Sequence, residues 1–446
     1  MARTRRRTRG LWTAFACLAL LADGGVRASA ASSPASTSAG ATSPVAGAGG
    51  SLPGSGGYPR VIRLEHAGDA DGTLIETDTD AFLGGTQRFH RSTDGGRSFD
   101  ALPSLTVTGN IHGTHLFELP ADAGDLPAGT LLFAAAVNPS AQYPAESGDT
   151  QMQIPVYRSD DGARSWTLLS YCTRTDDGSR TGGLWEPELH VADDGRLVCL
   201  YSDETDRPAH SQVLTQVTST DGGASWSEPQ QVVATPDPID RPGMPTTARL
   251  GDGTWVMTYE DCGIRHAPCL VLIRTGPDGI DWGPPTADGT VVASTDGARF
   301  LSAPTVAWTP DGGPRGTVLV IGRVLNGRDG YADPANGATV LASTGGAGGP
   351  WTRLVAPVSV PSSWGATPIN YSSPLLPLGD GLLLGVAADA PAERPVIRWG
   401  ITSLTAQPPL TTSATTTSPP PSARPTDGVS PATQAAPVAG TPRFTG

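Results

Sequence analysis

The sequence predicts an all-β fold, a β-propeller of six blades that are each a four-stranded antiparallel sheet. A glycine-containing turn followed by an apolar strand recurs at a spacing of about sixty residues, which lies within the range of propeller blades. Helical periodicity is almost absent along the chain. The predicted folded region is too long for one ordinary core but natural for a ring of repeats. The six copies of the turn and strand begin at Gly72, Gly129, Gly195, Gly253, Gly316 and Gly381.

Another short strand precedes each copy, so every repeat contains a hairpin. In residues 184–204 the two strands are joined by Asp193-Asp194-Gly195, where the glycine supplies the backbone freedom that a hairpin turn needs. The start of one strand then lies beside the end of the next, so the polar residues at both ends gather at one rim. The six preceding strands begin near Val61, Gly113, Trp185, Pro245, Ala303 and Tyr371.

A second motif, Ser-x-Asp-x-(Gly/Ala)-x-Ser-(Trp/Phe), alternates with these hairpins. It begins at Ser92, Ser159 and Ser219, and weaker copies end at Trp282 and Trp351. We expect a hairpin turn whose carboxylate accepts backbone N–H groups and whose aromatic ring packs into its blade. This structural role is favoured over a repeated catalytic or metal-binding role.

The two ends of the chain differ in composition from the repeats. Residues 1–30 combine clustered arginines, an apolar run and the small-residue site Ala28-Ser29-Ala30, which together predict a secretory signal peptide for a secreted, extracellular protein. The arginines leave both the general and the twin-arginine export routes open. Residues 31–57 read as an Ala/Ser/Gly/Pro-rich linker, 58–404 as the propeller, and 405–446 as a disordered Thr/Ser/Pro-rich tail.

The charge of the chain bears on its binding partners, and its cysteines bear on its disulfide bonds. The net charge of −13 argues against nucleic acid or an anionic membrane surface. No segment after residue 30 is apolar enough to span a membrane, and we expect a monomer. In an oxidising compartment the simplest pairing is Cys262–Cys269 and Cys172–Cys199, with free buried thiols as the alternative.

No cofactor is expected from the sequence, and no set of metal ligands stands out. The cysteines are not accompanied by Cys-x-x-Cys or clustered histidines, which disfavours zinc at these residues. The acidic loops leave a structural calcium ion open, because they would bind one or simply be solvated.

A candidate site follows from the strand order of the blades. The innermost strands start, and the second strands end, on the same face of the central channel. Glu186 and Glu260 come from adjacent blades on that face, and one protonated and one ionised carboxylate can hydrolyse a glycosidic bond. For each glutamate the alternative is a solvated or arginine-paired rim residue. Tyr371 starts the last inner strand and is either a site residue or a core tyrosine.

The Ser-x-Asp motif resembles the Asp-box of sialidases, and the six hairpin pairs resemble the sialidase propeller. Asp-boxes are shared by several hydrolases and binding proteins, so the resemblance is more specific for the fold than for the activity. It implies a tyrosine nucleophile at Tyr371 and an arginine clamp from Arg60 or Arg63, Arg241 or Arg265, and Arg323. The chain departs from the sialidase pattern in its Arg60-Val-Ile-Arg63 entry and in lacking a clear catalytic Asp loop, unless Asp78 or Asp80 serves.

A second resemblance covers residues 184–262. Trp185-Glu186-Pro187, Arg241-Pro-Gly-Met-Pro and Met257-Thr-Tyr-Glu260 look like glycoside hydrolase family 93, whose retaining exo-arabinanases release arabinobiose. The resemblance implies that Glu186 is the acid/base, Glu260 the nucleophile and Tyr371 a supporting residue.

These observations together predict a secreted retaining exo-glycosidase whose partner is an oligo- or polysaccharide, either arabinan or a similar neutral polymer. The alternatives are an exo-α-sialidase and a carbohydrate-binding propeller without activity. The residues expected to bind substrate come from the same rim: Arg60, Asp80, His115, Tyr201, Asp203, Arg241, Tyr259, Arg323 and Asn370.

Overall fold

The computed structural model describes residues 46–80, 84–138, 151–175, 182–264, 268–363, 369–391 and 394–405. All of them belong to the compact unit Ala41–Gly446. The expected signal peptide, the first part of the linker and nearly all of the C-terminal tail lie outside the described residues. Among the described residues, no helix is long and apolar enough to cross a membrane.

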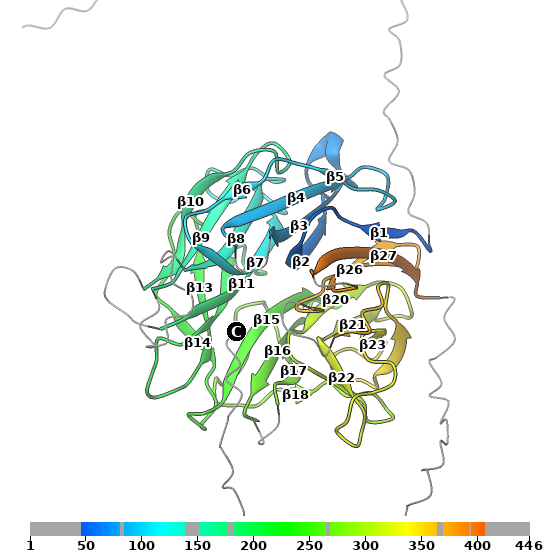
Figure 1. Cartoon of the computed structure of the whole chain (residues 1–446). Helices are drawn as coiled ribbons and strands as arrows, with labels where there is room; N and C mark the ends of the chain where they lie inside the picture. The colour runs from blue at the N-terminus through cyan, green and yellow to red at the C-terminus, as the bar shows by residue number, and fades with distance from the viewer. Residues whose placement is uncertain are drawn as a thin grey trace, which may run out of the picture. The chain divides into compact units, whose positions relative to one another are not determined.

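Six antiparallel sheets form the blades of a β-propeller, as the sequence predicts (Figure 1). The first blade also carries the short strand β6 (Leu105–Thr106), which pairs with β4. The first three blades contain β2 (Gly56–Arg63), β3 (Leu74–Asp80), β4 (Thr86–Ser92) and β5 (Asp100–Ala101); β7 (Asn110–Glu118), β8 (Leu131–Asn138), β9 (Gln153–Ser159) and β10 (Thr167–Arg174); and β11 (Leu184–Val191), β12 (Leu197–Asp203), β13 (Val213–Ser219) and β14 (Gln230–Val233).

The remaining blades follow the same plan. Two short strands, β19 (Arg299–Leu301) and β22 (Val324–Asn326), extend the fourth sheet beyond its blade. The last three blades contain β15 (Arg241–Arg249), β16 (Trp255–Cys262), β17 (Leu270–Gly276) and β18 (Thr290–Val291); β20 (Thr305–Thr309), β21 (Thr317–Ile321), β23 (Thr339–Ser343) and β24 (Thr352–Val355); and β25 (Leu375–Gly379), β26 (Leu382–Asp389), β27 (Val396–Ser403) and β1 (Gly49–Ser51).

The N-terminal strand closes the ring. β1 pairs with β27 and completes the sixth blade, so the first described strand belongs to the last sheet (Figure 1). Both β1 and the start of β2 lie inside the range 31–57 that we expected to be linker. The propeller therefore begins earlier than residue 58, because a β-sheet edge accepts any extended segment, including a glycine-rich one.

The core lies between neighbouring blades. Successive side chains along a strand point to opposite faces of their blade, so they pack against different neighbouring blades. On β3, Leu74 packs with Leu384 and Trp399 of the sixth blade. The next residue, Ile75, packs with Phe133 of the second blade. Second strands are thus buried on both faces, which explains why they are apolar along their whole length.

The Ser-x-Asp turns have the structural role expected for them. They connect the third and fourth strands in the first three blades. Asp94 Oδ1 accepts the backbone N–H groups of Arg97 and Ser98 at 3.0 Å, and Ser98 Oγ donates to Asp94 Oδ2 at 2.6 Å. Asp161 and Asp221 make the same kind of contacts. These carboxylates are therefore committed to turn formation.

One of the two expected disulfides is present and the other is not. Cys262 and Cys269 are bonded, whereas Cys172 and Cys199 are free. Pairing the latter was wrong: the two residues lie in different blades, on β10 and β12, within one apolar core cluster. Burial raises the pKa of the Cys172 thiol, and its contact with Cys199 adds to the rise. Both residues act as small apolar side chains.

Candidate active site

The six inner strands β2, β7, β11, β15, β20 and β25 surround the axis of the ring, and each contacts the next. Four of them are irregular at the end where they begin. The strand register shifts between Gly57 and Arg60 in β2, and equivalent shifts occur at the starts of β7, β11 and β15. Such β-bulges bend a strand and re-aim a side chain.

Residues at these irregular positions adopt a left-handed backbone that is uncommon outside glycine. The φ angles are 55° at Tyr58, 46° at Glu186 and 55° at Met244. In the fifth and sixth blades, Ala303 (47°) and Ser372 (55°) occupy the corresponding places ahead of β20 and β25. Backbone strain of this kind is often found at functional sites.

The side chains of the irregular positions converge. Tyr58, Met244, Ala303 and Tyr371, from four different blades, pack in one buried cluster. In blade two, the backbone at Gly113 lies close to Glu186. A Cβ added at Gly113 would lie 3.1 Å from Glu186 Cα, so the lack of a side chain permits this close approach. The bulges therefore bring all six blades to one place, with Glu186 among them.

Glu186 is a buried carboxyl group that accepts hydrogen bonds from Ser202 and from the Met244 backbone. Glu186 is only 6% exposed, and its Oε2 accepts a hydrogen bond from Ser202 Oγ at 2.6 Å. Burial raises the pKa of Glu186 to about 8; the Ser202 hydrogen bond opposes this rise and the Glu260 charge adds to it. At neutral pH, Glu186 therefore holds a proton.

Glu260 is also buried but has a different environment. Its Oε2 accepts the backbone N–H of Ala303 at 2.6 Å. Burial raises the pKa of Glu260, whereas the Ala303 N–H and the positive charges of Arg323 and Arg241 oppose the rise. Glu260 is thus the carboxyl group of the pair whose ionised form is stabilised by nearby arginines, although burial still raises its pKa.

Two tyrosines lie beside the glutamates. The rings of Tyr58 and Tyr371 are 5.8 Å apart, with Arg60 4.8 Å from the Tyr58 ring and Arg323 5.4 Å from the Tyr371 ring. Burial and the charges of Glu260 and Glu186 raise the pKa of Tyr371 well above its usual range. Tyr371 therefore remains a neutral phenol.

Glu188 forms a second, distinct hydrogen-bonding centre. Its Oε1 accepts the N–H of Thr247 at 2.8 Å, and its Oε2 lies 3.0 Å from His115 Nε2. Because His115 Nδ1 accepts the Leu189 N–H, its Nε2 carries the proton and donates to Glu188. Burial raises the pKa of Glu188 to about 7, against the charge of Arg60. Glu188 thus ties together blades two, three and four.

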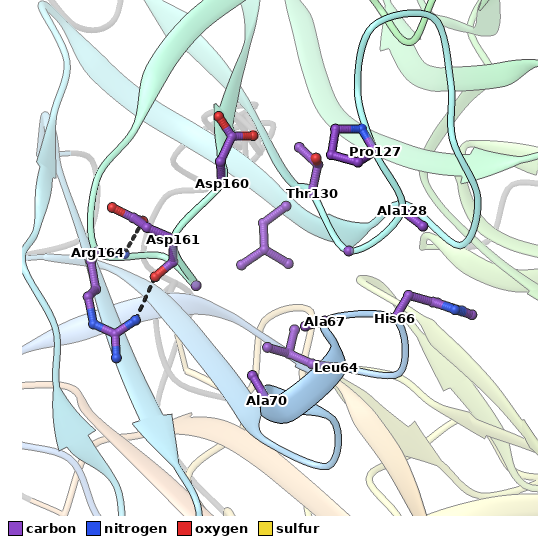
Figure 2. A pocket seen from close by; sticks show the side chains of 13 residues that line it. Leu64, His66, Ala67, Ala70, Pro127, Ala128, Thr130, Asp160, Asp161 and Arg164 are labelled. Carbon is purple, nitrogen blue, oxygen red and sulfur yellow. Dashed lines mark hydrogen bonds between the residues drawn. The ribbon is translucent and has the colours of Figure 1, made fainter. Parts of the chain in front are cut away.

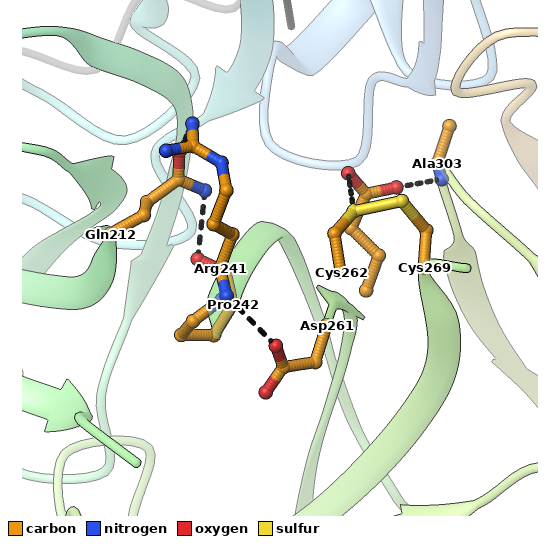
Figure 3. The surroundings of a disulfide bond; sticks show 8 residues. Gln212, Arg241, Pro242, Asp261, Cys262, Cys269 and Ala303 are labelled. Carbon is orange, nitrogen blue, oxygen red and sulfur yellow. Dashed lines mark hydrogen bonds between the residues drawn. A yellow bond between two sulfur atoms is a disulfide. The ribbon is translucent and has the colours of Figure 1, made fainter. Parts of the chain in front are cut away.

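Arg241 belongs to a polar network rather than standing alone. It pairs with Glu204 and donates to Gln212 Oε1 at 2.7 Å, while Gln212 donates to the carbonyl of Pro242. Figure 3 shows this network next to the Cys262–Cys269 disulfide, with Asp261 accepting the Arg241 N–H at 3.1 Å. The disulfide joins the end of β16, which carries Glu260, to the start of β17.

The other arginines and Asn370 hold the backbone around Tyr371. Arg60 Nη1 donates to the Ser372 carbonyl at 3.0 Å, and Arg323 Nε donates to the Ile369 carbonyl at 3.3 Å. Asn370 Nδ2 donates to the Arg323 carbonyl at 2.8 Å. These hydrogen bonds hold the backbone on both sides of Tyr371, and a role of the three residues in substrate binding stays a prediction.

Several predicted residues lie elsewhere. Tyr201 is fully buried in the core between blades two and three, and Tyr259 is fully buried next to blade three, where its hydroxyl accepts the Gly289 N–H at 2.9 Å. Alternation along β12 and β16 turns these rings away from Ser202 and Glu260. Asp203 is buried and accepts the Thr205 N–H, while Asp80 is half exposed and lies 3.5 Å from Arg88.

Sequence reasoning missed Tyr58, Ser202 and Met244. A signal was available, because a proline follows the irregular residue in most blades. Proline has no N–H to donate and suits a position outside the ladder of hydrogen bonds. The dipeptides are Tyr58-Pro59, Glu186-Pro187, Met244-Pro245 and Ala303-Pro304, and in the sixth blade Pro374 comes two residues after Ser372.

A cavity of about 440 Å³ lies at the other end of blades one and two (Figure 2). His66 and Ala128 contribute to its walls together with the Ser-x-Asp turn that contains Asp161. Asp161 already accepts hydrogen bonds from Ser159, Ser165 and backbone N–H groups. Its carboxylate is thus occupied by the turn, and the second acidic residue of the lining, Asp160, is exposed and lies 3.6 Å from Arg158.

Comparison of the sequence with protein-family models and with curated proteins gives no match. Solved structures do match. An α-L-arabinofuranosidase from Fusarium graminearum with an iminosugar inhibitor has a TM-score of 0.65 and 24% identity, over 80% of this chain and 95% of that one. An α-L-arabinanase from Penicillium chrysogenum with arabinobiose has a TM-score of 0.65 and 22% identity, over 81% and 98%. At these identities the likeness establishes a shared propeller fold.

Proposed function

We propose that this protein is a secreted, retaining, exo-acting glycoside hydrolase that cleaves arabinan or a similar neutral polysaccharide. Glu186 is the acid/base and Glu260 the nucleophile. The observation that carries the proposal is a pair of buried carboxyl groups where the inner strands begin and the second strands end: burial raises the pKa of both, to about 8 for Glu186, whereas two arginine charges oppose the rise only at Glu260. Two titratable groups whose environments separate their pKa values are the usual sign of an acid and a base.

The first step requires a proton and a nucleophile. Glu186, protonated at neutral pH, donates its proton to the glycosidic oxygen as the bond from that oxygen to the anomeric carbon breaks. Glu260, ionised, attacks the anomeric carbon and forms a covalent glycosyl ester. The positive charge of Arg323 near Glu260 favours the ionised nucleophile before the attack.

The second step reverses the roles. Glu186, now ionised, removes a proton from water, and the resulting nucleophile attacks the anomeric carbon and breaks the ester to Glu260. Two inversions give net retention of the anomeric configuration. Ser202 supports this stage, because its hydroxyl donates to Glu186 and stabilises the carboxylate form.

The likeness to arabinan-active enzymes favours a neutral sugar as substrate, and so do the arginines. A sugar carboxylate is bound best by arginines that are free to make bidentate contacts. Arg60 here donates to backbone carbonyls, and Arg241 is paired with Glu204. These observations count against the sialidase alternative.

The test compares Glu186→Gln and Glu260→Gln with the wild-type protein on arabinan, with sialyl-lactose as a second substrate. We expect each variant to lose at least about 10²–10⁴-fold in kcat, the contribution typical of general acid–base catalysis. Glu118→Gln is the matched control, since this carboxylate lies at the opposite end of β7 and accepts the backbone N–H groups of Glu65 and His66.

Product analysis by NMR then gives the anomeric configuration of the released sugar. Retention on arabinan with full activity in Glu118→Gln supports the proposal. Full turnover by either active-site variant would refute it. Glycan binding by the wild-type protein without hydrolysis would instead favour the carbohydrate-binding alternative.

A further inference from the structure

A buried cluster of polar side chains lies at the junction of the first and last blades. Glu76 and Asp78 come from β3, and Arg88 and His90 come from the neighbouring strand β4, where register pairs Glu76 with His90 and Asp78 with Arg88. Glu76 and Asp78 are 0% exposed and His90 is 2% exposed. Glu76 and Asp78 follow Leu74 at intervals of two residues along β3. Their side chains therefore lie on the same face as Leu74, toward the sixth blade.

The contacts within this cluster satisfy only part of it. His90 Nδ1 lies 2.8 Å from Glu76 Oε2 and 3.9 Å from Asp78 Oδ2. Arg88 pairs with Asp78 through Oδ1. The other two carboxylate oxygens, Glu76 Oε1 and Asp78 Oδ2, are buried without a hydrogen-bond partner in the described part of the chain. Buried polar atoms are rarely left in this condition, so they point to a missing partner.

We propose that Glu76, Asp78 and His90 bind a divalent metal ion of the zinc type at the closure of the propeller. One ligand atom from each residue lies within 4.8 Å of the other two, as a shared ion requires. This cluster has nothing to do with the cysteines that the sequence brought into consideration for zinc. It becomes apparent only when the register of β3 and β4 is known.

The ligand types select the class of ion. One imidazole nitrogen and two carboxylate oxygens suit zinc, which accepts four ligands of this kind at about 2.0–2.2 Å. Calcium needs about six to eight oxygen ligands, which three side chains do not supply. In the bound state His90 Nδ1 is the ligand atom, and the neutral imidazole carries its one proton on Nε2.

The charges and the location are consistent with a structural ion. In the ionised form that binds a metal, Glu76 and Asp78 bring two negative charges against the one positive charge of Arg88 in the buried group. Burying an uncompensated charge is unfavourable, so a divalent ion removes a cost from the folded state. The backbone that crosses from β1 to β2 covers the cluster, since Arg88 Nη1 donates to the Pro53 carbonyl at 3.0 Å. The ion thus holds the N-terminal segment and the first blade together.

The test uses the full secreted chain without an affinity tag, depleted of metal with a chelator and then titrated with zinc chloride. Elemental analysis after gel filtration gives the bound zinc, isothermal titration gives the affinity, and circular dichroism gives Tm. We expect a zinc ion per chain and a Tm that rises with zinc concentration. Glu76→Gln and His90→Gln should each weaken zinc binding by at least about 10–100-fold, the loss seen even for outer-shell changes.

His66→Gln is the matched control, because His66 lies by the cavity at the other end of the blades (Figure 2). It should bind zinc like the wild type. Cobalt absorption spectra of the wild-type protein provide a readout that does not depend on the variants folding. Intense visible bands support four-coordinate binding. Wild-type protein that retains no zinc or cobalt, or equal zinc affinity in His90→Gln, would overturn the proposal.

Discussion

The hydrogen bond from Ser202 to Glu186 allows the assignment of Glu186 as the acid to be tested by a shift in the pH profile of activity, without abolishing the activity. Ser202 Oγ lies 2.6 Å from Glu186 Oε2 and also accepts the Met244 N–H at 3.1 Å. The hydroxyl proton is therefore directed at Glu186, where it stabilises the ionised carboxylate. Ser202→Ala removes this donor, so we expect the pKa of Glu186, about 8 in the wild type, to rise.

The magnitude follows from the kind of hydrogen bond that is lost. A hydrogen bond to a charged group contributes about 1.5–3 kcal/mol. Since about 1.4 kcal/mol corresponds to one pKa unit, the pKa of Glu186 should increase by about 1–2. The substitution also removes one of the two acceptors of the Met244 N–H, which still reaches Glu186, so the free energy of unfolding should fall by about 0.5–1.5 kcal/mol. The variant is then less stable while its acid stays protonated to higher pH.

The assay is the pH dependence of kcat/KM on an arabinan-derived oligosaccharide, because this profile reports the pKa values of the free enzyme. The alkaline limb should move upward by about 1–2 pH units in Ser202→Ala. Ser202→Thr keeps the hydroxyl and should retain the wild-type limb. An alkaline limb that stays in place or moves downward in Ser202→Ala would refute the assignment of Glu186 as the acid held by Ser202.

Three further outcomes are expected. The pKa of Glu186 rises from 4.5 to about 8 on folding, so its contribution to stability is complete below pH 4.5 and is lost as the pH rises through 8. Thermal unfolding should therefore show Glu186→Gln gaining stability over the wild type across this window, by on the order of a few kcal/mol, and a constant difference would contradict it. Gly56→Ala places a Cβ against Asp78 Oδ1 and 2.9 Å from its Cγ, so chemical denaturation should show a loss of about 1–3 kcal/mol, whereas unchanged stability would show that the segment can shift. Unfolding without reductant should leave Cys172 and Cys199 open to alkylation, and mass spectrometry showing them bridged would refute the free-thiol state.

The sequence was sufficient to predict the repeats because a propeller repeats its turns as well as its strands. The predicted turn-plus-strand copies coincide with the second strands β3, β8, β12, β16, β21 and β26. The same regularity brought Glu186, Glu260 and Tyr371 to one rim, since equivalent strand ends meet there. Burial, followed by the charges of Glu260 and Glu186, raises the pKa of Tyr371.

The side of the strand on which a residue lies could not be predicted in the same way. Second strands are buried on both faces, so apolar residues do not alternate with polar ones and give no information on direction. Tyr201 and Ser202 illustrate the result, because the tyrosine packs between blades while the adjacent serine reaches Glu186. The cluster of Glu76, Asp78 and His90 was hidden for a related reason, since it depends on the pairing of two strands.

At the starts of the inner strands, the backbone conformation is the same although the side chains differ in chemistry. Tyr58, Glu186, Met244, Ala303 and Ser372 have φ angles within a narrow range of 46–55° although their side chains differ completely. The backbone at these positions is therefore set by their place at or just before the start of an inner strand, not by the side chain. A substitution at Met244 should consequently alter the surroundings of Glu186 while the strand keeps its course. This arrangement lets one propeller fold present an acid, a phenol or an apolar group at equivalent points around its axis.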